Sequence, residues 1–400
     1  MNILVINAGS SSLKFQLINM DNKDVIAKGN VEKISEKGSF LKYKAKGKEY
    51  KFEKDVTNHS EGMEMVLEKL VDKEIGVISS LDEIEAFGHR VVNVGEEYFD
   101  STLVTPEVLE DFRLNVDFSP LHVPGAICGI EAAMNLCPNK PNVAVFDIGF
   151  HKSIPEHIYK YAIPKKYYDM YKIRRYGAHG TSHYYVTNRC ASLMGKRPED
   201  INIVSCHLGS GASITAVKNG KSFDTSMGFT PLEGIMMNTR SGDIDPAVIE
   251  YICNKEGKTV SEVVRMLNKE SGLLGAIGTG MSDMRDITEN LSDPNVKNAF
   301  DMYCHRIKKY ICAYMGVLGG ADAIVFTAGC GEHTPELREA VVEGLEFMGV
   351  ELDKDANNNA PRGEEVLISK PTSKVKIYVI PTDEEMVIAE ETLKTINNLR

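Results

Sequence analysis

Residues 3–14, ILVINAGSSSLK, decide the fold, because an apolar strand runs directly into a loop of small polar residues. A second run with period-two character, residues 15–18, follows this loop, so residues 2–18 are predicted to form strand, tight loop and strand. The segment 202–217 repeats the plan around residues 209–213, GSGAS. Such a repeat, half a chain apart, favours two similar domains, although two hairpins can also resemble each other by chance.

Further strands are predicted where apolar runs end in polar or glycine-rich residues. Residues 143–146 precede Asp147, residues 323–326 precede a glycine loop, and residues 375–380 precede Glu384. In α/β folds such strand exits collect ligands. The predicted fold is α/β, with mixed sheets flanked by helices, and the helical patterns cover residues 61–71, 124–136, 183–194, 244–255, 259–268, 296–318 and 335–348.

Composition narrows the class of protein. The 400 residues are 42% hydrophobic and carry a formal net charge of -11, without the basic patch that a nucleic-acid partner would require. The eight cysteines show no zinc-ligand spacing and are interpreted as reduced thiols. Neither a signal peptide nor an apolar run of membrane-spanning length is visible, so a soluble, cytoplasmic protein is expected, without nucleic-acid or membrane partners.

Three small-residue loops are candidate phosphate or nucleoside sites. In the first loop, Ser10, Ser12 and Lys14 offer two hydroxyls and an ammonium beside a strand end. It is not a Walker A loop, since the lysine opens a strand rather than a helix, and a plain serine-rich hairpin is the alternative. The other two loops, which could equally be ordinary turns, comprise His207, Leu208, Gly209, Ser210 and Gly211, and Gly329, Cys330, Gly331, Glu332 and His333.

Cationic side chains suit phosphoryl transfer, which depends on positioning and on neutralising charge over the equatorial oxygens. Arg90 ends an apolar stretch and Arg240 lies in a polar loop, although either could be a surface ion pair. His179, flanked by glycine, could hydrogen-bond a migrating phosphoryl group. A phospho-histidine route is the weaker alternative, and His122 and His183 could instead cap helices.

Acidic residues at strand exits complete the candidate set. A Mg²⁺ ion on nucleotide phosphates needs only one or two protein oxygens, which Glu384 and the amide of Asn7 could supply. Asp147 follows a strand directly. Each acid could otherwise be a helix cap or a first-turn charge.

Taken together, these motifs resemble the acetate kinase family, within the superfamily of acetate and sugar kinases, heat-shock chaperones and actin. The matching stretches span nearly the whole chain: 7–15, 88–92, 120–122, 174–177, 179–183, 224–233, 239–247 and 381–385. The resemblance implies two ribonuclease H-like (actin-like ATPase) domains, residues 1–148 plus 385–400 and residues 149–384. It also implies a homodimer that uses Mg²⁺ and ATP.

Position by position, the resemblance assigns roles to these residues. Asn7 and Glu384 would bind the metal, and Arg90, Arg240, His179 and Asp147 would be catalytic. The acid would contact Arg90, Val92, Leu121, His122, Ala178 and Pro231. Nucleotide contacts would come from Ser10, Ser12, Lys14, residues 207–211, Asp283, Met284, Arg285 and residues 329–333.

Several positions depart from the family pattern, and Ala178 is the most informative. The family usually has phenylalanine there, lining the methyl pocket. Alanine leaves room for a longer acid, and one more buried CH₂ contributes about 0.8 kcal/mol, roughly fourfold in specificity. The other departures, which bear on nucleotide preference and phosphate contacts, are Asn93, Val94, Ile148, Gly149, Ser210, Asn238, Cys330 and His333.

The expected reaction is reversible, direct in-line transfer from ATP to the carboxylate of a short-chain fatty acid, with acetate favoured and propionate or butyrate as alternatives. A carboxylate is already anionic, so Asp147 is expected to position a neighbour rather than accept a proton.

A sugar kinase of the same superfamily would need an aspartate base beside a polar pocket. A chaperone or filament module would need an added binding domain or a polymerising surface.

Overall fold

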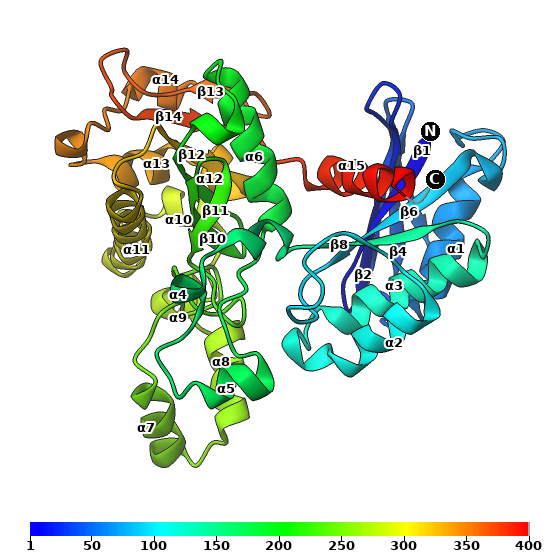
Figure 1. The fold of residues 1–400 in the computed structure, drawn as a ribbon, viewed down its shortest axis with the longest axis horizontal. Helices are drawn as coiled ribbons and strands as arrows, with labels where there is room; N and C mark the ends of the chain where they lie inside the picture. Colours follow the sequence, from blue (N-terminus) through cyan, green and yellow to red (C-terminus); the bar gives the residue numbers. More distant parts are fainter. Residues whose placement is uncertain (399–400) are drawn as a thin grey trace. The chain divides into compact units, whose positions relative to one another are not determined.

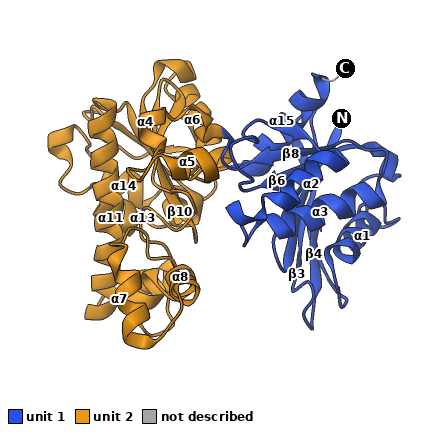
Figure 2. Ribbon diagram, turned by 60° about the horizontal axis from the view of Figure 1, so that its bottom comes forward, with its two compact units in different colours: residues 1–149, 383–400 blue, residues 150–382 orange. Residues whose placement is uncertain are grey.

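The computed structural model describes residues 1–398, which form two compact units. Unit 1 comprises Met1–Gly149 together with the carboxy-terminal segment from Asp383, and unit 2 comprises Phe150–Thr382 (Figure 2). Each unit has its own sheet and its own apolar core, so each is described separately.

Unit 1 is built on an eight-stranded mixed sheet with the order β5-β4-β3-β2-β1-β6-β8-β7. β1 pairs antiparallel with β2 and parallel with β6, which in turn pairs parallel with β8. The strands are β1 (Asn2–Ala8), β2 (Ser12–Asn19), β3 (Asp24–Glu32), β4 (Phe40–Ala45), β5 (Lys48–Glu53), β6 (Ile84–Val91), β7 (Thr102–Leu103) and β8 (Asn142–Phe146).

Helices cover both faces of this sheet, because alternate residues of β1 point to opposite sides. Leu4 and Ile6 pack in one cluster with α1 (His59–Leu70) and α3 (Val123–Leu136), whereas Ile3 and Val5 pack in another with α15 (Glu384–Asn397) (Figure 1). The unit also contains α2 (Pro106–Leu114) and the 3₁₀ turns η1 (Leu81–Glu83) and η2 (Val116–Phe118). The apolar run at residues 3–6 is therefore buried on both faces, as its composition requires.

Unit 2 has a six-stranded mixed sheet with the order β11-β10-β9-β12-β14-β13. β9 pairs antiparallel with β10 and parallel with β12, so its strand plan repeats that of β1, β2 and β6. The strands are β9 (Ile203–Leu208), β10 (Ala212–Lys218), β11 (Lys221–Thr225), β12 (Ala323–Thr327), β13 (Val366–Leu367) and β14 (Lys376–Val379). The predicted repeat of one hairpin plan in an α/β fold with mixed sheets is confirmed.

The helices of unit 2 again cover both faces of its sheet. The long helix α11 packs on one face with Val204, Cys206 and Ile214, and α6 packs on the other with Ile203 and Val217 (Figure 1). The helices are α4 (Glu156–Tyr159), α5 (Lys166–Tyr171), α6 (Gly180–Leu193), α7 (Ala247–Glu256), α8 (Val260–Lys269), α9 (Gly272–Ile277), α10 (Met284–Glu289), α11 (Pro294–Leu318), α12 (Ala328–His333), α13 (Pro335–Val342) and α14 (Lys354–Asn358). Short 3₁₀ turns are η4 (Pro198–Asp200) and η5 (Glu346–Met348), and η3 (Gly149–Ser153) begins at the last residue of the first segment of unit 1 and continues into unit 2.

One predicted helix is too long. The pattern at residues 335–348 indicated a single helix, but α13 ends at Val342 and η5 follows separately. Gly344 has a φ of 80°, a left-handed conformation that interrupts a right-handed helix. The helical spacing of apolar residues continues past this glycine, and for that reason the predicted helix was too long.

Within the part of the chain that the structure describes, every helix is too short or too polar to cross a bilayer. All eight cysteines are free thiols, in agreement with the prediction from their spacing.

Gly88→Ala should destabilise unit 1, because α15 packs directly on β6 at this glycine. An added Cβ would lie 2.4 Å from Thr392 Oγ1 and 2.9 Å from Ile388 Cγ2. We expect a loss of about 1–3 kcal/mol in the free energy of unfolding, measured by urea titration. The control is Gly316→Ala, on an exposed face of α11 with nothing within 4 Å, which should gain about 0.5–1 kcal/mol. Equal stabilities of the two variants would contradict this packing.

Candidate active site

The first predicted phosphate loop is a tight turn between β1 and β2. The Gly9 amide donates to the Ser12 carbonyl at 2.8 Å, and Asn7 faces Lys14 across the hairpin. His59 Nε2 of α1 donates to the Gly9 carbonyl at 2.7 Å. Because C=O and N–H point in opposite directions in a trans peptide, this bond turns the Ser10 amide away from α1. Ser10 and Lys14 are exposed, so the loop presents donors to solvent.

Arg90 is held by a buried carboxylate at the ends of two neighbouring parallel strands. Arg90 Nε and Nη2 donate to the two Asp147 carboxylate oxygens at 3.0 and 2.5 Å, and Glu384 lies 3.9 Å from Arg90 Nε. Burial by itself would lower the pKa of Arg90, but Asp147 and then Glu384 outweigh it and raise the pKa. Asp147 is fully buried, whereas the Arg90 side chain is 22% exposed. The paired guanidinium therefore has a fixed orientation and a solvent-facing edge.

The other predicted site residues of unit 1 differ in how far they are exposed. Val92 is buried, whereas Leu121 is 56% exposed and His122 is the residue before α3. The Asn7 side chain makes no hydrogen bond to any residue from 1 to 398, so its amide oxygen is available.

The two predicted metal ligands, Asn7 and Glu384, differ in the kind of oxygen that they offer. Within residues 1–398 no three His, Cys, Asp or Glu side chains form a metal cluster. Asn7 and Glu384 offer one amide oxygen and one carboxylate, which suits a Mg²⁺ ion carried mainly by phosphates and water.

In unit 2, Arg240 and His179 approach the glycine loop between β9 and β10. A Cβ built on Gly211 would lie 3.4 Å from Arg240 Nη1 and 3.5 Å from His179 Nε2. The two nitrogens therefore border the same small space. Pro231, predicted beside the substrate, lies here too, because its carbonyl accepts from Arg240 Nη1 at 3.1 Å. Glycine at 211 leaves this space open.

Arg240 differs from Arg90 in its electrostatic surroundings. Among residues 1–398, no carboxylate lies within ion-pair distance of Arg240, and desolvation by burial lowers the pKa of its guanidinium. Its loop is closed by a bond from the Met237 amide to the Arg240 carbonyl at 3.0 Å. A partly desolvated cation without a paired anion is a favourable place for an anionic ligand.

The two predicted nucleoside segments are each held by local contacts. Burial raises the pKa of the Cys330 thiol to about 11, and the charge of Asp283 adds to the shift. Asp283 also caps α10 and pairs with Arg285 at 2.7 Å, while Met284 is buried. The buried Arg338 donates to the carbonyls of Gly331 and Glu332 and fixes the α12 turn.

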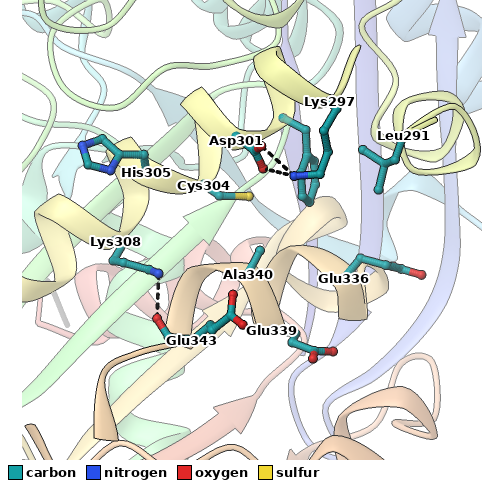
Figure 3. Close-up of a pocket in the computed structure, with 11 residues that line it drawn as sticks. Leu291, Lys297, Asp301, Cys304, His305, Lys308, Glu336, Glu339, Ala340 and Glu343 are labelled. Atoms are coloured by element: carbon teal, nitrogen blue, oxygen red, sulfur yellow. Dashed lines mark hydrogen bonds and ion pairs between the residues drawn. The ribbon is translucent and has the colours of Figure 1, made fainter. Parts of the chain in front are cut away.

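A separate pocket of about 540 Å³ lies between α11 and α13 (Figure 3). It contains none of the predicted site residues. Its Lys297 pairs with Asp301 on the same helix, and its Lys308 donates to the Glu343 carbonyl. Both lysines already have partners, so the pocket gives no reason to move the candidate site.

Comparison with known proteins identifies the family. Residues 2–390 match the Acetokinase family. The chain is 51% identical to the acetate kinase of Caldanaerobacter subterraneus subsp. tengcongensis and 49% identical to that of Thermotoga maritima, with complete coverage of both proteins in each comparison. The chain belongs to the acetokinase family.

Solved structures of related kinases have the same fold. The Porphyromonas gingivalis acetate kinase superposes with a TM-score of 0.93 at 43% identity, covering 99% of each chain. The Francisella tularensis propionate kinase gives 0.91 at 39% identity, covering 98% of this chain and 99% of its own. The predicted family resemblance and fold are confirmed.

Sequence reasoning missed the part that Arg175 plays in shaping the site. Arg175 donates to three successive carbonyls, those of Thr225, Ser226 and Met227, and pairs with Glu233 at 2.6 Å. These contacts tie down the loop that carries the predicted substrate-side proline. Arg175 belonged to a recognised motif, but nothing in its spacing indicated which carbonyls it would reach.

His89, the neighbour of Arg90, should make stability depend on pH. Burial lowers the pKa of His89 to about 4, with a partly opposing hydrogen bond to Asn142. As the pH falls through about 6.5, His89 binds a proton in the unfolded chain, whereas in the folded chain it stays neutral down to about pH 4. Acidification therefore favours the unfolded state and lowers the free energy of unfolding. Between pH 7.5 and 5.5 this loss is about 1 kcal/mol.

His89→Gln keeps a donor for Asn142 and should remove that part of the loss, as measured by urea titration at both pH values. His157→Gln, at an exposed histidine, is the matched control and should behave as the unaltered protein. An unchanged pH dependence in His89→Gln would contradict the assignment.

Proposed function

We propose that the protein transfers the γ-phosphoryl group of ATP reversibly to the carboxylate of acetate, giving acetyl phosphate and ADP. Family membership over the full chain supports the reaction class. The observation that carries the proposal is the partly desolvated Arg240 without a carboxylate partner among residues 1–398, beside His179 and Gly211. That arrangement favours a group whose negative charge grows during reaction.

The proposed mechanism is a direct in-line displacement. A carboxylate oxygen of the acid forms a bond to the γ-phosphorus, and the bond from that phosphorus to the β–γ bridging oxygen breaks, leaving its electron pair on ADP. No base is required, since the attacking carboxylate is already anionic. Asp147 is fully engaged with Arg90, which supports a positioning role rather than proton transfer.

Each group of residues has a separate proposed role, which follows from its charge and its position. Arg90 binds the carboxylate of the acid, Arg240 and His179 stabilise the phosphoryl group, and the loop at residues 10–12 with Lys14 binds phosphate oxygens. Asn7 and Glu384 would hold Mg²⁺, which neutralises phosphate charge when bound. Residues 207–211, 283–285 and 329–333 bind the nucleotide.

Two broader expectations accompany this function. The protein is proposed to be a cytoplasmic homodimer, and its eight free thiols suit a reducing compartment. Exposed apolar side chains on the adjacent helices α7 and α8, among them Tyr251 and Val260, support self-association. A single-chain mass by light scattering would contradict the dimer.

The first experiment is a hydroxamate assay of acyl phosphate formation with acetate, propionate and butyrate, each with ATP, GTP and pyrophosphate. Acyl phosphate should form from acetate and ATP, and absence of product with every acid would contradict the function. Because of Ala178, propionate or butyrate should compete within about fourfold in kcat/KM. Ala178→Phe should then sharpen the preference for acetate, and a sharp acetate preference in the unaltered protein would refute the part assigned to Ala178.

Arg240→Ala should lower kcat by about a thousandfold, as expected for an arginine that stabilises transition-state charge. Arg90→Ala should chiefly raise KM for the acid, because its contact is formed before transfer. Steady-state kinetics with varied acid and fixed ATP separates the two effects. Equal and mild effects of both substitutions would argue against these roles.

A further inference from the structure

A buried chain of hydroxyl and imidazole groups lies under His179, on the α6 face of the sheet. Strand alternation places Ser205 and His207 of β9 and Ser213 of β10 on this face, opposite the apolar residues that pack against α11. His183 Nδ1 lies 2.8 Å from Ser205 Oγ, and its Nε2 lies 2.8 Å from Ser213 Oγ. Ser213 Oγ is also 2.9 Å from His179 Nδ1.

The direction of these hydrogen bonds follows from the first hydroxyl. Ser205 is completely buried, and among residues 1–398 His183 Nδ1 is the one acceptor within reach of its hydroxyl. A buried hydroxyl hydrogen that has no acceptor is unfavourable, because the group has lost its bond to water and gains none in the protein. Ser205 therefore donates, and His183 Nδ1 accepts.

The remaining bonds are then determined in turn. A neutral imidazole that accepts at Nδ1 carries its proton on Nε2, so His183 donates to Ser213 Oγ. Ser213 must direct its own hydrogen to its other partner, His179 Nδ1. A neutral His179 that accepts at Nδ1 carries its proton on Nε2, the nitrogen that borders Gly211 beside Arg240.

The tautomer of His207 is set in the same way, by the hydroxyls of Thr382 and Ser182. Thr382 Oγ1 donates to Ser182 Oγ at 2.7 Å, and Ser182 Oγ lies 2.7 Å from His207 Nδ1. Because Ser182 Oγ accepts from Thr382, its own hydrogen is directed to His207 Nδ1. A neutral His207 that accepts at Nδ1 carries its proton on Nε2. The His179 and His207 rings stack with centroids 4.0 Å apart and planes 17° apart, so the two Nε2–H groups border neighbouring glycines of one loop, Gly211 and Gly209.

We propose that Ser213, with Ser205 and His183 behind it, is a positioning residue that holds His179 as the neutral Nε2–H tautomer, the form that donates a hydrogen bond from Nε2 to the transferring phosphoryl group. This inference rests on the proposed phosphoryl transfer. Its consequence is that His179 stabilises charge without being protonated or phosphorylated.

The electrostatic surroundings agree with neutral rings. Burial lowers the pKa of His183 well below its usual value, and the nearby His151 and His207 lower it further. His151 is itself fixed, with its nitrogens 2.8 Å from Ser222 Oγ and from the Ala178 carbonyl. The charge of Arg240 near Gly211 disfavours a second cation on His179.

The direct test is ¹⁵N NMR of imidazole nitrogens in the whole protein labelled at histidine. The chain has ten histidines, and His179→Gln and His183→Gln assign the two signals. In the unaltered protein we expect a proton on Nε2 and an unprotonated Nδ1 for both rings near pH 7.5. A proton on Nδ1 of neutral His179 overturns the inference.

Kinetics provides the second arm. Ser213→Ala should lower kcat about tenfold and leave KM for ATP within about twofold, since a donor orientation is lost and not a ground-state contact. Ser213→Thr, which retains the hydroxyl on the strand, should recover most of the rate. Ser205→Ala should act in the same direction with a smaller effect. Equal losses in Ser213→Ala and Ser213→Thr overturn the inference.

Thr215→Val is the matched control. Thr215 is a buried hydroxyl two residues along β10, but its partner is Thr225 Oγ1 at 2.9 Å and not a histidine. Its kcat and its imidazole signals should match the unaltered protein. If the unaltered protein forms no acyl phosphate, the proposed function is wrong, while the NMR result still tests whether Ser205, His183 and Ser213 set the tautomer of His179. If it forms acyl phosphate but His179 has the opposite tautomer, only the inference about these three residues is wrong.

Discussion

The strict alternation of side chains along β9 and β10 is the constraint on which the candidate site depends. Apolar residues of both strands pack toward α11, which obliges Ser205, His207 and Ser213 to face α6. A polar residue inside a sheet covered on both faces must find partners, and these three find them in side chains of α6 and in His179, the residue that precedes this helix. Apolar packing on one face thus positions the chemistry on the other.

The two arginines show how burial and pairing separate binding from stabilisation of charge. Arg90 is oriented by two bonds to the buried Asp147, so its charge is largely compensated before any ligand arrives. Arg240 contacts a carbonyl and a thioether but no carboxylate among residues 1–398, so its charge remains for an anion. A compensated cation suits orientation of a substrate, whereas an uncompensated one suits charge that develops during transfer.

Much of the fold could be predicted from local pattern. The apolar run at residues 3–6, the glycine loop at 209–211 and the repeated hairpin plan all depend on neighbours in sequence, and the structure contains them. The helix predicted at 335–348 was too long because apolar spacing continues past Gly344, whose left-handed backbone ends the helix. The hydrogen bonds by which Arg175 and His59 hold their loops were not predicted, because their partners are backbone carbonyls distant in sequence, which leave no pattern to detect.

The sequence by itself determined the two α/β units, the family and the identity of the charged residues, because strand periodicity, turn chemistry and ordered motifs are local properties of the chain. Only the tertiary structure decided which arginine is paired, which hydroxyl faces which imidazole and which nitrogen of His179 carries a proton. Those properties depend on distances of about 3 Å between side chains far apart in sequence, and such distances follow from how helices pack on sheets rather than from residue order.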